Sequence, residues 1–263
     1  ETVCAITATG EPYCWGDNGA GQLGIGALGA GTGRTVPTRV AGQARFKAIS
    51  VGTTHACGLA EDGRAYCWGG GYGATGVVMP DSAFCQGTNC WYTTPQPVST
   101  TARFRSISAG NGFTCAVATD GAGYCWGAQF DEFNRYGVLG SGSKQGSPTP
   151  VLVAGGLSFT EIDTGTRAAC GLTADGAAYC WGANFGGELG IGRRDDDAHP
   201  NPQRVSGDVR FRTLSLGEVS CGISTQAHLY CWGVTDAGHL GNGESGSGVR
   251  TTPTRVLDPI PAG

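Results

Sequence analysis

Short stretches in which apolar and polar residues alternate run through the whole chain, separated by glycine-rich segments. In one copy of the pattern the stretches are residues 37–40, 44–52, 55–62 and 63–69. Alternation with a period of two is typical of β-strands that bury one face. In the last stretch Tyr66 and Trp68 therefore share one face, and Cys67 lies on the other. The pattern predicts four short strands per copy.

The copies are marked by a recurring phrase: a cysteine, nine further residues, then Cys-Trp-Gly. The Cys-Trp-Gly units stand at residues 14–16, 67–69, 125–127, 180–182 and 231–233. Four antiparallel strands in a repeat of about forty to fifty residues are typical of a propeller blade. We predict an all-β fold, a β-propeller of four-stranded antiparallel blades with five repeat units in one domain over residues 1–263. The aromatic face of each blade is expected to pack against a neighbouring blade.

The sequence pattern at both ends of the chain indicates partial repeats. The chain opens inside a repeat, and it ends just after TPTRV, which we interpret as the first strand of a further repeat. In one interpretation five blades close a ring, and residues 253–256 pair beside the sheet that contains Cys4 and Cys14. In the other, the chain is a stretch of a longer propeller, with flanking blades elsewhere or supplied by another chain. The closed ring is favoured because it leaves no open sheet edges.

The ten-residue spacing of the cysteines predicts one disulfide in each hairpin. Turn sequences such as Asp62-Gly63 stand midway between the cysteines, and only the last copy, Thr225-Gln226-Ala227, lacks the glycine. A hairpin centred there places its two cysteines directly opposite one another, within reach of a disulfide. The predicted pairs, together with one in an insertion, are Cys4–Cys14, Cys57–Cys67, Cys115–Cys125, Cys170–Cys180, Cys221–Cys231 and Cys85–Cys90.

Metal binding is the competing interpretation of the cysteines. Structural zinc sites favour pairs separated by about two to four residues and often recruit histidine. The repeat pairs enclose nine residues, and the four histidines follow no repeat, although the four-residue gap between Cys85 and Cys90 would also suit a metal. All 12 cysteines find a partner. This arithmetic predicts maturation in an oxidising place, either extracellular or periplasmic.

Composition limits the classes of partner. The net charge is −4, and the only lysines are Lys47 and Lys144, which argues against a nucleic-acid-binding surface. The 48 glycines have no three-residue period and therefore indicate many turns. The sequence has no apolar run long enough for a membrane span and no start typical of a signal peptide, so we interpret it as a mature or trimmed product.

Several motifs together resemble the regulator of chromosome condensation repeat. They are ARFKAISVGTTHACGLAEDGRAYCWG, the loops GDNGAGQLGIG, GANFGGELGIG and GVTDAGHLGNG, and the PTRV that follows. The resemblance covers essentially the whole chain and implies a propeller, most often of seven blades in that family.

The resemblance leaves function open, because members of the family serve as exchange factors, enzyme inhibitors, light sensors and interaction modules. The cysteine pairs look like those of secreted bacterial relatives, which include a protein inhibitor of β-lactamase. They differ from the nuclear member, which acts on a small GTPase in a reducing compartment. Plant photoreceptor members cluster tryptophans at the blade front, where this chain has Thr54-His55, Phe113, Arg167 and Val219. The sequence gives no support for that photochemistry.

Candidate binding residues lie in the loops after each Trp-Gly, where the repeats differ from one another. Aromatic side chains beside a few charges are typical of binding hot spots. The candidates are Tyr72, Phe84, Trp91, Tyr92, Phe130, Phe133, Tyr136, Phe185, Arg193 and Arg194. The alternative is that these aromatics are buried as small satellite cores beneath the loops.

No residue pattern predicts catalysis, a cofactor or a metal. Asp195-Asp196-Asp197 lacks the spacing of a calcium loop and is interpreted as a solvated acidic turn. Asp131-Glu132 are neighbours in sequence, whereas glycosidase carboxylates face each other across a sugar. No serine occupies a G-x-S-x-G turn.

The sequence therefore predicts a secreted, non-enzymatic propeller that recognises a protein or glycan through its variable loops. The alternatives are a filament or surface component completed by neighbouring subunits, an inhibitor of an extracellular enzyme, and a sugar-binding module.

Overall fold

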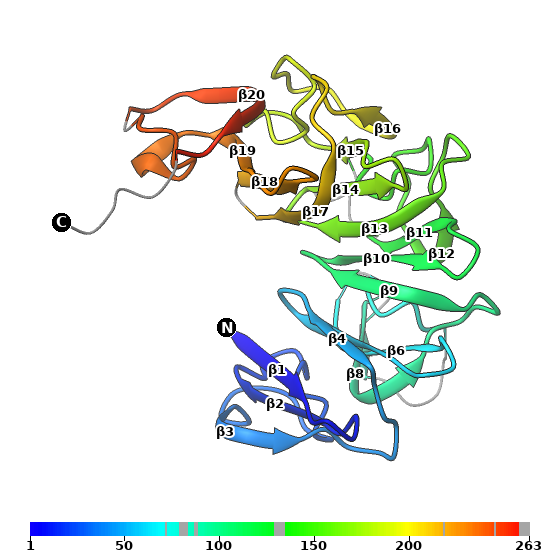
Figure 1. Cartoon of the computed structure of the whole chain (residues 1–263). Coiled ribbons are helices and arrows are strands. Elements are labelled where there is room, and N and C mark those ends of the chain that lie inside the picture. The colour runs from blue at the N-terminus through cyan, green and yellow to red at the C-terminus, as the bar shows by residue number, and fades with distance from the viewer. Residues whose placement is uncertain are drawn as a thin grey trace.

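The computed structural model contains five antiparallel β-sheets that follow one another around an open arc (Figure 1). The structure describes residues 1–71, 73–78, 84–86, 89–128, 135–217, 219–244 and 246–257, of which 84–86, 89 and 237 are described by their backbone alone. Within these residues no helix is long and apolar enough to cross a membrane.

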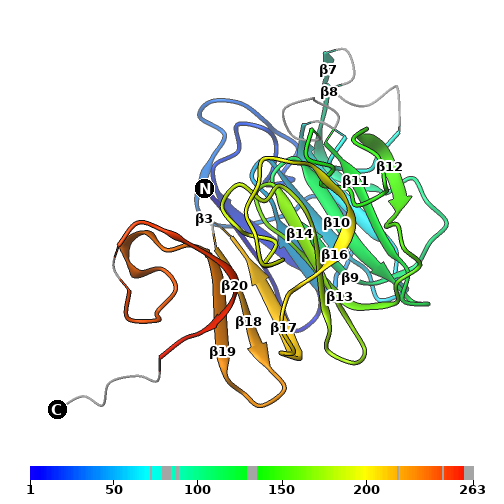
Figure 2. The ribbon, with the colours of Figure 1, turned by 90° about the horizontal axis from the view of Figure 1, so that it is seen from above.

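Each sheet is built from one repeat. The first holds β1 (Thr2–Ile6), β2 (Pro12–Gly16) and β3 (Arg34–Arg39). The second holds β4 (Ala48–Val51), β5 (His55–Leu59), β6 (Ala65–Gly70), β8 (Asn89–Pro97) and β7 (Phe84–Gln86), in that spatial order. The third holds β9 (Phe104–Ala109), β10 (Phe113–Ala118), β11 (Gly123–Gly127) and β12 (Ser147–Leu152). The hairpin of β7 and β8 extends away from the other sheets (Figure 2).

The last two sheets repeat the four-stranded order of the third. The fourth holds β13 (Phe159–Thr164), β14 (Ala168–Thr173), β15 (Ala178–Gly182) and β16 (His199–Arg204). The fifth holds β17 (Phe211–Leu216), β18 (Val219–Ser224), β19 (Leu229–Val234) and β20 (Val249–Arg255), with a short 3-10 turn, η1 (Asp236–Gly238), between the last two strands. The all-β prediction of repeated antiparallel sheets is confirmed.

The hairpin disulfides are present in all five repeats. Cys57 stands opposite Cys67 in the β5–β6 register, with 4.1 Å between their Cα atoms, and the other four hairpins have the same pairing. The β7–β8 register places Cys85 opposite Cys90, and Cys90 is disulfide-bonded. The side chain of Cys85 lies outside the described residues, so that sixth bridge stays a prediction.

Tryptophans at the Cys-Trp-Gly position pack between neighbouring repeats. Trp68, Trp126, Trp181 and Trp232 are fully buried, as predicted. Each packs against a phenylalanine of its own repeat, with ring centroids 5.7 to 5.9 Å apart: Phe46, Phe104, Phe159 and Phe211. The loop of the preceding repeat covers each indole so closely that a Cβ atom on Gly24 would lie 2.7 Å from Trp68 Nε1.

The first sheet departs from this prediction because Trp15 is only partly buried. No loop of a preceding repeat covers it among the described residues.

The PTRV segments lie in a different sheet from the one expected. β3 pairs with β2 and β20 pairs with β19, so each segment is the last strand of its own repeat and not the first strand of the next. The chain leaves the Trp-Gly strand, makes a glycine-rich loop, and returns to the edge that it has just left.

The predicted pairing of residues 253–256 beside Cys4 and Cys14 is therefore wrong. The ring of five blades that depended on it is not formed, and the first and fifth sheets stand apart across the opening of the arc (Figure 1). The same finding removes the basis for a filament assembled through that terminal strand.

Candidate functional site

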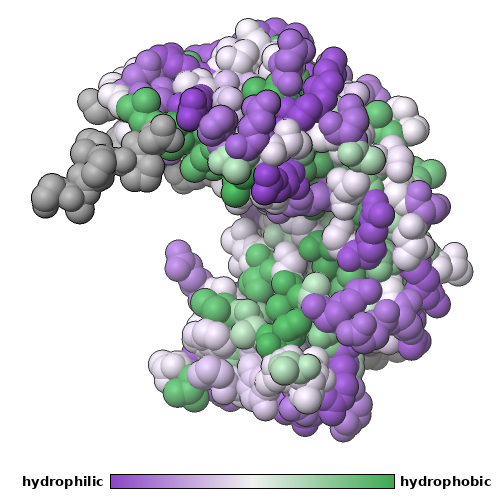
Figure 3. Space-filling view, viewed as in Figure 1, coloured by the Kyte–Doolittle hydropathy of each residue, from purple (hydrophilic) through white to green (hydrophobic). Residues whose placement is uncertain are grey.

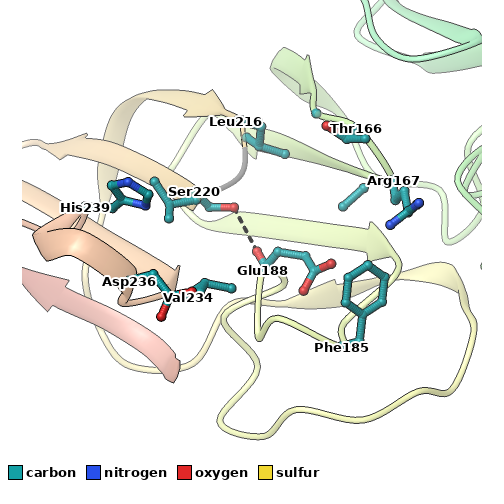
Figure 4. A pocket seen from close by; sticks show the side chains of 13 residues that line it. Thr166, Arg167, Phe185, Glu188, Leu216, Ser220, Val234, Asp236 and His239 are labelled. Atoms are coloured by element: carbon teal, nitrogen blue, oxygen red, sulfur yellow. Dashed lines mark hydrogen bonds between the residues drawn. The ribbon is translucent and has the colours of Figure 1, made fainter. Parts of the chain in front are cut away.

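A cavity of about 290 Å³ lies between the fourth and fifth sheets, at the end where the loops after Trp-Gly emerge. The turn before β14, the loop after β15, the turn between β17 and β18, and η1 all contribute to it (Figure 4). Its lining residues are Gly165, Thr166, Arg167, Ala168, Phe185, Glu188, Leu216, Gly217, Val219, Ser220, Val234, Asp236 and His239.

The loop that carries Glu188 is held in place by the tryptophan of the next sheet. The backbone oxygen of Glu188 accepts hydrogen bonds from Trp232 Nε1 and from Ser220 Oγ, both at 2.9 Å. Gly190 has φ +67°, and a Cβ atom there would lie 2.7 Å from the Trp232 Nε1 atom. Only glycine combines this backbone conformation with so close an approach. These contacts direct the Glu188 side chain into the cavity (Figure 4).

The Glu188 carboxyl group is partly withdrawn from water. Its Oε2 atom accepts a hydrogen bond from the Gly186 backbone N–H at 2.7 Å. Burial raises the pKa of Glu188, while backbone hydrogen bonds and the positive charge of Arg167 oppose that shift. The carboxylate is therefore less well solvated than an exposed one, and it favours a positive charge nearby.

An aromatic row continues outward from the cavity. The Phe185 ring, whose residue is 36% exposed, lies 5.8 Å from the Tyr136 ring, measured between centroids. The Arg167 guanidinium lies 5.4 Å from the Phe185 centroid, and that of Arg135 lies 4.6 Å from the Tyr136 centroid. Cation–π contacts of this kind hold the rings and guanidinium groups in one surface row. We call Arg135, Tyr136, Phe185 and Arg167 the aromatic row.

The opposite end of the cavity is formed by the fifth sheet. Figure 4 places His239 and Asp236 there, across from Phe185 and Arg167. Leu216, Val219 and Val234 add apolar side chains to the lining. The cavity thus has apolar sides and charged ends.

A larger space adjoins this cavity on the inner side of the arc. It measures about 810 Å³ and shares Gly165, Thr166, Leu216 and Gly217 with the smaller cavity. Turns that follow the inner strands β4, β9, β13 and β17 line it, together with residues of the first repeat. Figure 3 shows the molecule hollowed along this inner side. The loops after Trp-Gly and these turns lie on one face of the arc, which we call the loop face. The two cavities make its surface continuously concave.

The structure brings some of the predicted binding residues together and separates others. Tyr136 and Phe185 lie in the aromatic row, although 49 positions separate them in the sequence. Trp91 lies on the β8 strand, against the backbone of Gly70. Tyr92 is only 3% exposed, and its hydroxyl group donates to the Val77 backbone oxygen, so it belongs to the core and leaves the candidate set. Three further aromatic candidates, Tyr72, Phe130 and Phe133, lie outside the described residues. Phe84 is described by its backbone alone.

The charged loop after β15 pairs some of its own charges. Arg193 Nε donates to Asp195 at 2.8 Å, and His199 Nε2 lies 2.8 Å from the other oxygen of Asp195. Burial alone would raise the pKa of Asp195, but the hydrogen bonds from His199 and Arg193 lower it below its usual range. Arg194 is exposed and does not line the cavity. No group of three potential metal ligands occurs in the part of the chain that the structure describes.

The sequence pattern left out Glu188, Asp236 and His239. Glu188 and His239 occupy the variable position of the Gly-x-Leu-Gly segment. That position follows a glycine with positive φ in both loops, Gly187 and Gly238. A charged residue at this position is the signal that would have pointed to the cavity.

Comparison with known proteins identifies the repeats. Two models described as the regulator of chromosome condensation (RCC1) repeat match the chain, one at residues 46–73, 104–137 and 159–188, the other at residues 9–59 and 175–224. The chain is 32% identical over 251 residues to the ultraviolet-B receptor UVR8 of Arabidopsis thaliana, covering 92% of this chain and 53% of the receptor.

Solved structures show the same fold. Human WBSCR16 superposes with a TM-score of 0.79 at 18% identity, covering 98% of this chain and 65% of that one. Yeast RCC1 (Prp20), in a structure with Kap60 bound, superposes with a TM-score of 0.78 at 20% identity, covering 99% of this chain and 62% of that one. The chain thus spans between half and two thirds of the length of these relatives.

Proposed function

Since this chain belongs to the regulator of chromosome condensation repeat family, we propose that it is a non-enzymatic propeller that binds a macromolecular partner, a protein, through the loop face. The fold supports binding through loops, because its strands and tryptophans serve the packing of sheet on sheet. In the related yeast structure, the RCC1 protein is bound to Kap60.

The aromatic row is the observation that carries this proposal. Aromatic and arginine side chains dominate the binding energy of protein interfaces when they surround a pocket. Tyr136 and Phe185 supply two rings, Arg135 and Arg167 lie over them, and the cavity opens beside them. Their mutual contacts keep the side chains ordered before a partner arrives, which reduces the entropy cost of binding.

A pair of matched substitutions tests the proposal. The whole chain serves as bait for proteins from the culture medium and cell envelope of its source, with Phe185→Ala as the site variant. Leu229→Ala is the control, because Leu229 is similarly exposed, at 42%, but lies at the start of β19, at the hairpin end of its sheet. We expect a partner that Leu229→Ala retains and Phe185→Ala loses. Equal capture by both variants would place recognition elsewhere.

The disulfides support a second part of the proposal, that the protein works in an oxidising compartment, outside the cell or in a periplasm. Within the described residues the five hairpin cysteine pairs are all bridged. Bridges in this number are typical of exported proteins. Thiol trapping of the protein from its native source tests this: we expect no free thiol, and a fully reduced natural protein would contradict the assignment.

A further inference from the structure

Glu188 presents its carboxylate to the cavity without an ion-pair partner among the described residues. Oε2 accepts the Gly186 N–H, and the backbone N–H of Glu188 itself is a second donor to the carboxyl group. Among the described residues Glu188 forms no ion pair within 4.0 Å. The nearby cation, Arg167, lies over the Phe185 ring at the outer end of the cavity. A partly buried carboxylate without an ion-pair partner is a binding group for a hydrogen-bond donor that carries positive charge.

The walls of the cavity fit an aliphatic stem behind such a charge. Leu216, Val219 and Val234 line it, and the Phe185 ring closes one end. Asp236 stands at the opposite end and adds a second carboxylate to the lining (Figure 4). Lysine and arginine combine an apolar stem with a charged head, and both bury the stem while pairing the head.

The charges of the lining favour a cation over an anion. Among the described residues, the lining includes two carboxylates, those of Glu188 and Asp236, one guanidinium group, that of Arg167, and the imidazole of His239. Arg167 is exposed and lies over the Phe185 ring, and although its charge lowers the pKa of Glu188, the two side chains form no ion pair within 4.0 Å.

We propose that this cavity receives a basic side chain, lysine or arginine, of the partner protein, with Glu188 as the residue that pairs with its charged head. The inference rests on the proposed function, and it names the chemistry that the partner must present at the loop face. A cation bound at Glu188 also offsets the cost of keeping this carboxylate charged in a partly buried place. The aromatic row then contacts the surface of the partner around the inserted side chain.

Small probes test the cavity without a partner protein. The whole chain, carrying isotope-labelled methyl groups, is titrated by NMR with n-butylammonium, n-butylguanidinium, n-butanol and n-butyrate. We expect weak, saturable shifts of the Leu216, Val219 and Val234 methyl groups with the two cations. Whichever cation binds more tightly identifies lysine or arginine as the inserted residue. Equal binding of butanol or butyrate, or no saturable shift with either cation, would overturn the proposal.

Two variants with the same change of net charge distinguish cation binding by Glu188 from a general effect of the protein's net charge. Glu188→Gln keeps the shape of the side chain and an acceptor for the Gly186 N–H, and we expect it to weaken cation binding about tenfold, the effect of a charge-assisted hydrogen bond. Asp208→Asn changes an exposed aspartate in the turn before β17 and should leave binding unchanged. Equal affinity of Glu188→Gln and the natural protein refutes the assignment.

The probe experiment and the capture experiment fail independently. If butylammonium binds at Glu188 while Phe185→Ala retains every captured protein, the proposed function fails and the cavity remains a cation site. If Phe185→Ala loses the partner while no cation enters the cavity, the loop face is an interface and the basic-side-chain inference is wrong.

Discussion

Replacing His55 with phenylalanine should make the protein markedly more resistant to acid. His55 is fully buried, and its Nε2 atom lies 2.8 Å from the Thr114 hydroxyl oxygen. That hydroxyl donates its only proton to the Ala74 backbone oxygen at 2.8 Å, so His55 Nε2 must be the donor toward it. Nδ1 is then the unprotonated nitrogen, and among the described residues it has no hydrogen-bond partner. A proton added at Nδ1 therefore meets no acceptor among the described residues and is buried away from the surface.

The size of the effect follows from the pKa. Burial lowers the pKa of His55 from 6.5 to about 4 in the folded protein. Because the unfolded chain takes up the proton near pH 6.5, stability is lost as the pH falls from about 6.5 toward 4. A difference of about 2.5 pKa units amounts to about 3 kcal/mol of unfolding free energy between pH 7 and pH 4. His55→Phe removes this loss.

The neighbouring repeat shows that phenylalanine fits this position. His55 pairs with Gly69 in its hairpin as Phe113 pairs with Gly127 in the next, and Phe113 is fully buried. The assay is urea unfolding of both proteins at intervals between pH 7 and pH 4, with the disulfides intact. The shifted carboxyl groups are common to both proteins, so their contributions cancel in the difference. Unfolding free energies that fall in parallel with pH would show that His55 is not buried uncharged, and would refute the reasoning.

Three further substitutions test the repeat architecture. Ala227→Gly should stabilise the protein by about 1 kcal/mol in urea unfolding, because Ala227 holds φ 65° at the turn where other repeats carry glycine, and a loss of stability would contradict this. Replacing Cys57 and Cys67 together with alanine should cost about 2 to 3 kcal/mol through the lost loop closure, and an unchanged melting temperature would show the bridge to be incidental. Trp181→Ala should cost about 3 to 5 kcal/mol and Trp15→Ala clearly less, since Trp181 is fully buried between sheets and Trp15 is not, and equal costs would argue against this packing.

The hairpins could be predicted from the sequence because each is closed within one repeat. Cys57 and Cys67, and the Asp62-Gly63 turn between them, lie within eleven consecutive residues, so local geometry alone specifies their pairing. The placement of residues 253–256 could not be predicted in this way. A strand that follows a long loop has the same sequence whether it joins the preceding or the following sheet, and the free edge of β19 decides between them.

Closure of the ring also lay beyond the sequence pattern. It depends on how successive sheets pack on one another, through contacts between repeats such as that of the Gly24 loop with Trp68. The candidate site was reached in part. Composition singled out Tyr136 and Phe185, but their contact depends on two loops from adjacent sheets. The Glu188 side chain points into the cavity because the indole of Trp232 holds the Glu188 backbone oxygen.

The five bridges have a mechanical consequence, since each lies inside one hairpin and none joins two sheets. Under tension applied at the two ends, adjacent sheets are held only by packing and hydrogen bonds, so they can peel apart one after another. Within each released repeat, the ten-residue span between the bridged cysteines stays shut and withholds roughly 30 Å of extended chain. A stretched molecule would therefore be shorter than its sequence length implies. It would also keep five closed hairpin loops, from which the sheets can re-form once the force is removed.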